Sequence, residues 1–169
     1  MPLEDLIANP ITGIRPFNEL PIDAEIWREA HDQHAQHRRL HNVAAHRPGI
    51  VHGLEVVVSQ TKERTVVVAP GVAVDADGNV VAMGEPPVAF TLEEKGQIYI
   101  VLTFLRATDR KSAITVGSGQ QHYRIVEGRD VRATKELPTG AYVELARIWR
   151  TGAEKPVKEA ANPFDPGND

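Results

Sequence analysis

The sequence of 169 residues contains no cysteine, so neither a disulfide bond nor a thiolate metal site can form. Aromatic residues make up only 5% of the chain, which argues against a sugar-binding platform of stacked rings. The longest apolar run is far shorter than the roughly 20 residues that a membrane span needs. The opening stretch MPLEDLIANP has neither the basic region nor the apolar region of a secretory signal. We therefore expect synthesis in the cytoplasm and no membrane partner.

Basic charge is also scarce, because the formal net charge is −4 and the sequence pI is about 6.0. A general nucleic-acid-binding protein would need a concentrated basic surface, so no nucleic-acid partner is expected. The nucleophile motif GxSxG is absent, and GSGQ (117–120) lacks the spacing of a phosphate loop. DADGN (75–79) lacks the later glycine and glutamate of a calcium loop, and a type I′ turn explains it better. The sequence predicts a non-enzymatic protein without a cofactor.

Four segments follow from the patterning: an extended arm (1–22), a helix (23–47), an antiparallel β domain (48–150) and a flexible tail (151–169). The predicted fold class is α+β and mainly β, with one long N-terminal helix before a small antiparallel sandwich or barrel-like domain. Short polar connections favour antiparallel pairing over crossover helices. The expected strands are 49–60, 65–70, 72–75, 79–83, 87–92, 97–107, 112–117, 121–128 and 141–150.

The ends of the helix are clearly marked. Asp23 can accept hydrogen bonds from the open N–H groups of the first turn, and Glu25 suits the positive end of the helix dipole. At the other end, Pro48 disfavours helical geometry in Arg47, and Gly49 lets the chain turn. About six helical turns lie between these signals.

The helix holds the stretch HDQHAQHRRLH (31–41), in which four of the seven histidines fall within eleven residues. At 100° per residue, three of them share an uncharged arc, and the charged residues gather on the opposite side. The histidine-bearing arc is therefore expected to be buried against protein. Its spacing alternates threes and fours, as in the a/d seam of a coiled coil. The arc comprises Trp27, Ala30, His34, His37, His41 and Ala44.

Three interpretations of these histidines remain open. They could pack, neutral, against the protein's own sheet, or they could form polar layers in a bundle of identical helices. They could also bind a metal ion through His34, His37 and His41, above all if copies converged on a threefold axis. One helix does not easily direct three imidazoles at one ion, so we expect no metal. In the bundle, acidification to about pH 5–6 should charge the imidazoles and loosen assembly.

Four motifs follow one another along the chain: RLHN (39–42), GIVHGLEV (49–56), PGVAVDADG (70–78) and LARI (145–148). With them the chain resembles, over roughly residues 17–149, a widespread group of phage-tail, baseplate and tail-fibre-attachment proteins. That group also occurs in contractile injection systems. Its members join a helix to a β module, and the shared positions are turns and core residues. Leu54, Val56, Leu145 and Ile148 are expected in the core, and Gly71 is expected to take a positive φ in a type II turn after Pro70.

The resemblance implies a structural subunit of a phage tail, baseplate or tail-derived contractile particle, assembled into a virion or tail-like particle. Its partners would be copies of itself, first of all in a trimer, and other tail or baseplate subunits. The predicted helix and the extended arm would make these contacts, with the arm lacing across a neighbour. A receptor- or carbohydrate-binding module of a tail fibre, or a histidine-based metal-binding protein, is the alternative. The aromatic candidates for such a module, which we expect to be buried in strands, are Tyr99, Tyr123, Tyr142 and Trp149.

Overall fold

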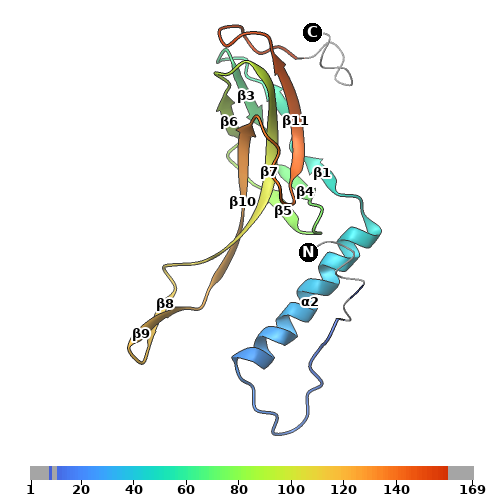
Figure 1. Ribbon diagram of the computed structural model, residues 1–169, viewed down its shortest axis with the longest axis vertical. Coiled ribbons are helices and arrows are strands. Elements are labelled where there is room, and N and C mark those ends of the chain that lie inside the picture. Colours follow the sequence, from blue (N-terminus) through green and yellow to red (C-terminus); the bar gives the residue numbers. More distant parts are fainter. Residues whose placement is uncertain (1–7, 9–10, 160–169) are drawn as a thin grey trace.

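The computed structural model describes residue 8 and residues 11–159 of the chain. The other residues of the predicted arm and tail, 1–7, 9–10 and 160–169, lie outside this range. The described part is mainly β, with one long helix that precedes all the strands (Figure 1). The elements are α2 (Ala24–Ala45), β1 (Gly49–Gly53), β2 (Val56–Val58), β3 (Thr65–Val68), β4 (Gly71–Val74), β5 (Val80–Met83), β6 (Val88–Thr91), β7 (Gly96–Thr108), β8 (Ala113–Val116), β9 (Gly119–His122), β10 (Ile125–Thr134) and β11 (Val143–Arg150).

The strands of the described chain form three small sheets and one separate hairpin, and every pairing is antiparallel. The sheet orders are β1-β4-β5, β2-β3-β6 and β10-β7-β11, and β8 pairs with β9. The predictions of a mainly β fold and of antiparallel pairing are therefore confirmed. The sheets do not close into a barrel, and the division into four segments remains a prediction.

The crossing between β1 and β2 explains why one predicted strand, 49–60, becomes two. Leu54 has a left-handed backbone (φ 63°) and a fully buried side chain, so the chain leaves one sheet and enters the next at this residue. Gly71 lies against this crossing without a positive φ, contrary to the prediction of a type II turn. It is required for another reason, because a Cβ on Gly71 would overlap the backbone of His52 and Leu54.

All three sheets contribute side chains to one core. Its fully buried members include Leu54, Val66, Val81, Ile100 and Leu102. Burying a Val, Leu or Ile side chain contributes about 1.5–3 kcal/mol, so this cluster is the main source of stability. Leu54 was predicted for the core and is confirmed. The other three predicted core residues are partly buried and pack against the cluster; they are Val56, Leu145 and Ile148.

β7 and β10 extend far beyond this core. β7 is buried at Ile98 and at residues 100–102, whereas residues 105–108 are exposed. β10 stays paired with β7 over its whole length, and β8 and β9 follow as a hairpin at the tip. Figure 1 shows the resulting ribbon projecting from the lower end of the sheets. Residues 129–134, which belong to β10, were not predicted as strand.

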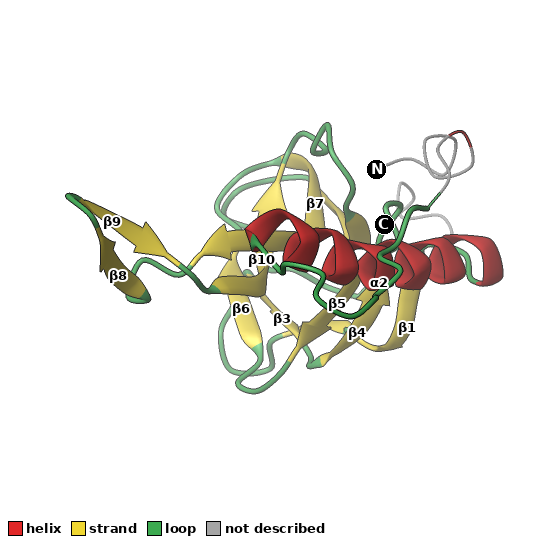
Figure 2. Ribbon diagram, turned by 90° about the horizontal axis from the view of Figure 1, so that it is seen from below, coloured by secondary structure: helices red, strands yellow, loops and turns green. Residues whose placement is uncertain are grey.

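The helix α2 also leaves the lower end of the sheets, and in Figure 1 it slants in roughly the same direction as the ribbon; Figure 2 shows the same two elements from below. Its N-cap is as predicted, because an Asp23 side-chain oxygen accepts from the N–H groups of Glu25 (3.0 Å) and Ile26 (2.9 Å). The described residues before α2 run back along the helix, where Gly13 lies against the Gln33 side chain. Among the described helices, α2 included, none has the length and apolar character needed to cross a bilayer.

Candidate assembly surface on α2

The helix α2 is attached to the β domain by polar contacts with the β4–β5 turn. Arg39 Nε donates to the Asn79 side-chain oxygen at 3.0 Å, and Asn42 Nδ2 donates to the Gly78 carbonyl at 2.9 Å. Arg39 and Asn42 belong to the RLHN motif, and Gly78 ends the PGVAVDADG motif. We call these contacts the latch. Two sequence motifs thus meet in space, although about 40 residues separate them.

The turn that receives the helix is built around the buried carboxylate of Asp75, which is 1% exposed. One oxygen of Asp75 accepts from the N–H groups of Asp77 and Asn79 at 2.9 Å each, and the Asn79 amide donates to both oxygens. The turn lies where it was predicted, but it is not the predicted type I′ turn: the Gly78 N–H donates to the Asp75 carbonyl, the central residues Ala76 and Asp77 lack the positive φ that type I′ requires, and only Gly78 is left-handed (φ +75°). A Cβ on Gly78 would lie 2.6 Å from the Arg39 carbonyl, so the turn touches the helix backbone directly.

The latch fixes the rotation of α2 and turns the histidine-bearing arc away from the body. Arg39, Asn42 and Val43 face the turn, and residues on the opposite side of the helix are exposed. The interpretation that the histidines pack against the protein's own sheet is therefore wrong. The reason is that the turn offers carbonyl and amide groups, which match the polar face of the helix. The six residues of the arc are exposed, except for the half-buried Ala30.

Three histidines in or near this arc make local contacts. His31 Nδ1 lies 2.8 Å from the Trp27 carbonyl, and the two rings are 4.7 Å apart. His41 and His46 meet edge to face with ring centroids 5.5 Å apart. Within the described residues, no three His, Asp or Glu side chains lie close enough together to hold a metal ion. The arc is thus an uncovered helix surface, with Trp27 60% exposed at its N-terminal end.

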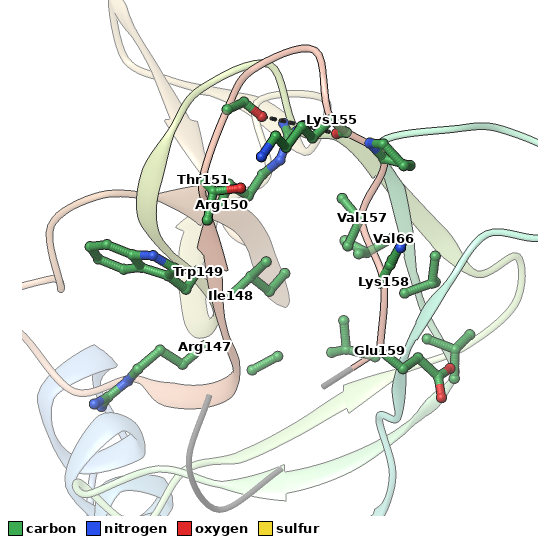
Figure 3. A pocket seen from close by; sticks show the side chains of 16 residues that line it. Val66, Arg147, Ile148, Trp149, Arg150, Thr151, Lys155, Val157, Lys158 and Glu159 are labelled. Atoms are coloured by element: carbon green, nitrogen blue, oxygen red, sulfur yellow. Dashed lines mark hydrogen bonds between the residues drawn. The ribbon is translucent and has the colours of Figure 1, made fainter. Parts of the chain in front are cut away.

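A groove of about 740 Å³ lies between two unpaired strand edges, those of β2 and β11 (Figure 3). The chain returns through it after β11, and Val157 joins the core there. Arg150 holds this return in place: it is 4% exposed, and its guanidinium donates to the carbonyls of Gly152, Ala153 and Lys155. Burial, and then the charge of Arg64, lowers the pKa of Arg150. The returning segment therefore forms part of the wall of the groove (Figure 3).

The four aromatic candidates do not gather at one site. Tyr99 stacks with Arg147 on the outer face of β7 and β11, at 5.2 Å from guanidinium carbon to ring centroid. Tyr123 and Trp149 are 61% and 54% exposed, so the prediction that these rings are buried in strands is wrong for both. Tyr123 lies on the ribbon, and the Trp149 ring points away from the groove (Figure 3).

The ribbon is a feature that the sequence analysis missed. Its residues 105–129, here called the ribbon arm, carry six of the large exposed apolar side chains. The available signal was the predicted strand 97–107, which is longer than the usual 3–10 residues of a strand. The six side chains, each 47–61% exposed, are Leu105, Ile114, Val116, Tyr123, Ile125 and Val126.

Comparison with known proteins gives a likeness of fold. The crystal structure of TssK superposes with a TM-score of 0.51 at 9% sequence identity, over 88% of this chain and 40% of the TssK chain. This chain thus spans less than half the length of TssK. No protein-family model matches the sequence, and no curated protein matches it. The chain therefore shares a fold with part of TssK.

Proposed function

We propose that this protein is a structural subunit of a phage tail, a baseplate or a related contractile particle, with a role in assembly and not in catalysis. Its proposed self-association surface is the arc of α2, composed of Trp27, Ala30, His34, His37, His41 and Ala44. The observation that carries the proposal is that this arc is exposed while the polar face of the same helix is latched to the body.

An exposed helix face with an a/d pattern is suited to packing against other helices. α2 has no buried residue within the described chain, so its own fold does not use the arc. Packing of the arc against identical helices would remove apolar area from water at about 25 cal/mol per Å². The histidines would then lie in polar layers, which can set the register and the number of subunits. A trimer is the state we propose first.

The likeness to TssK supports the class of particle. TssK is a baseplate component of type VI secretion. The sequence resemblance to tail and baseplate proteins rests on different observations, namely the latch motifs and the strand motifs. Both lead to the same class of contractile assembly. The proposed partners are therefore further copies of this chain and other tail or baseplate subunits.

The proposal is tested first by mass measurements on the purified protein over a wide concentration range. We expect an oligomer, and we expect Ala44→Glu to dissociate it because a carboxylate would be buried in the seam. Ala24→Glu is the matched control, since Ala24 is exposed on α2 outside the arc. A protein that stays monomeric at all concentrations, or one in which both variants behave alike, would refute the proposed surface.

Membership of a particle is tested separately. A tagged chain expressed in its own host should co-purify with sheath and tube proteins, and Ala44→Glu should reduce this recovery. Recovery of the wild-type chain alone, under conditions in which intact particles are isolated, would contradict the assignment to a contractile assembly.

A further inference from the structure

The ribbon arm is too exposed to be explained by the fold of one chain. A two-stranded ribbon without a covered face is marginally stable in water. The arm nevertheless has an ordered junction between its stem and tip. Ser112, which is 5% exposed, donates from Oγ to the Asp109 carbonyl (2.6 Å), and the same Oγ accepts from Arg124 N–H (3.0 Å). The chain thus maintains a defined ribbon whose apolar side chains have no cover among the described residues.

One face of the stem is apolar throughout. Paired residues of antiparallel strands share a face, so the pair Ala107 and Val126 lies beside the pair Leu105 and Gly128. A Cβ on Gly128 would meet nothing within 4 Å, and its φ is not in the left-handed range. Nothing in the described part of the chain therefore requires glycine here. In a strand, a glycine often marks a place where another backbone comes close.

The arm is positively charged, although the chain as a whole is negative. Residues 105–129 contain five basic and two acidic residues, a net charge of +3. Arg106 pairs with Glu127 at 4.0 Å, whereas Arg110 and Lys111 have no ion pair in the described part of the chain. The arm thus offers a basic junction at Arg110 and Lys111 together with apolar side chains.

A surface of opposite character lies at the beginning of α2. Residues 17–27, here called the α2 base, contain Glu19, Asp23 and Glu25 and no basic residue. The base also displays Phe17 and Ile22, which are 67% and 68% exposed and lie outside the arc of α2. A turn orders it, because the Leu20 N–H donates to the Phe17 carbonyl at 3.2 Å.

Arm and base project from the same end of the molecule (Figures 1 and 2), and no hydrogen bond or ion pair joins them among the described residues. We infer that the ribbon arm of one copy docks on the α2 base of a neighbouring copy. This inference rests on the proposed self-association. It makes the contact between neighbours heterologous, with the arm of each copy on the base of the next. Such contacts close into a ring or continue as a filament.

The size of the contact decides its role. Twelve residues at about 3.3 Å each give the arm a reach of about 40 Å, and two strands give it a width of about 10 Å. One face then covers roughly 400 Å² on each partner, about half of what a standard interface buries. The arm contact is therefore a clamp that adds to the α2 seam and does not replace it.

Charge exchange tests the pairing of these two surfaces in the full chain. Arg110→Glu with Lys111→Glu should raise the dissociation constant of the oligomer at least tenfold, and so should Glu19→Lys with Glu25→Lys. Combining all four changes should restore it to within about threefold of wild type. Lys62→Glu with Lys158→Glu, outside both surfaces, is the matched control and should have little effect. Failure of the combined variant to recover would overturn the pairing.

Cross-linking through introduced cysteines gives a second test. The chain has no cysteine of its own, so no native thiol can react with the cross-linker. Tyr123→Cys and Ile22→Cys proteins, mixed and treated with a short bismaleimide, should form a covalent heterodimer, and neither protein alone should cross-link. An oligomer of wild-type mass without this heterodimer would overturn the arm inference and leave the proposed function standing. A monomer in every experiment would overturn both.

Discussion

Gly78→Ala should detach α2 from the β domain. Gly78 has φ +75°, and a Cβ there would lie 2.6 Å from the Arg39 carbonyl and 2.8 Å from the Val43 side chain. An alanine in this conformation costs about 1–2 kcal/mol. The contact with the Arg39 carbonyl also forces helix and turn apart, since neither backbone can yield. Both hydrogen bonds of the latch would then be lost.

The expected size of the effect follows from these contributions. Each latch hydrogen bond contributes about 0.5–1.5 kcal/mol, so that with the backbone strain the total is about 3 kcal/mol. This corresponds to roughly a hundredfold increase in local opening of α2. The core strands should keep their protection, because α2 buries none of its residues in the core. Once detached from the turn, α2 should also unfold readily, because isolated helices of this length are only marginally stable.

Hydrogen exchange measured by mass spectrometry tests this directly. Amides of 24–45 should exchange about a hundredfold faster in Gly78→Ala, while those of β7 should be unchanged. Gly140→Ala is the control, because a Cβ on Gly140 meets nothing within 4 Å. If α2 exchanges at the wild-type rate in Gly78→Ala, the latch does not hold the helix and the reasoning is wrong.

Two further substitutions test other parts of the structure. Arg150→Lys should lower the unfolding free energy by about 2 kcal/mol, because the lysine side chain is one bond shorter and its single nitrogen cannot bind both the Glu94 carbonyl and the three carbonyls that Nη2 reaches; thermal denaturation should show a loss of about 4–8 °C. The exposed Arg147→Lys is its control and should change stability by less than 1 kcal/mol. Ser112→Ala should speed amide exchange in residues 113–122 and leave the core strands unchanged, whereas Ser118→Ala, at the exposed tip, should do neither.

Local signals in the sequence were sufficient to predict the ends of α2 and the β4–β5 turn. Asp23 caps the helix through its own side chain, and Gly78 follows Asp77 in a tight turn, so each signal acts within a few residues. The strand pattern likewise indicated a mainly β fold. In each case the physical cause and its effect are neighbours in the chain.

The rotation of α2 could not be predicted in this way. The uncharged arc was expected to be buried because apolar faces usually are, but Arg39 and Asn42 find polar partners some 36–40 residues away. Such pairings depend on where the β4–β5 turn lies in space. Gly71 was misread for a similar reason, since it is required by the approach of the β1–β2 crossing and not by its own φ. Residues 129–134 of β10 were not predicted as a strand because the sequence GRDVRAT (128–134) is mostly polar.

The latch also sets which face of α2 is presented to a neighbour, and an insertion can separate that role from folding. One alanine inserted between His37 and Arg38 leaves the latch intact but rotates everything before it by about 100°. Trp27, Ala30 and His34 would then leave the line of His41 and Ala44.

The helix content should stay the same by circular dichroism, while the oligomer should dissociate because the seam is split. Four inserted alanines rotate the same segment by about 400°, only about 40° out of phase, and should recover much of the association. Equal association with one and four insertions would mean that the orientation of the arc is irrelevant. Assembly would then have to depend on another surface of the protein.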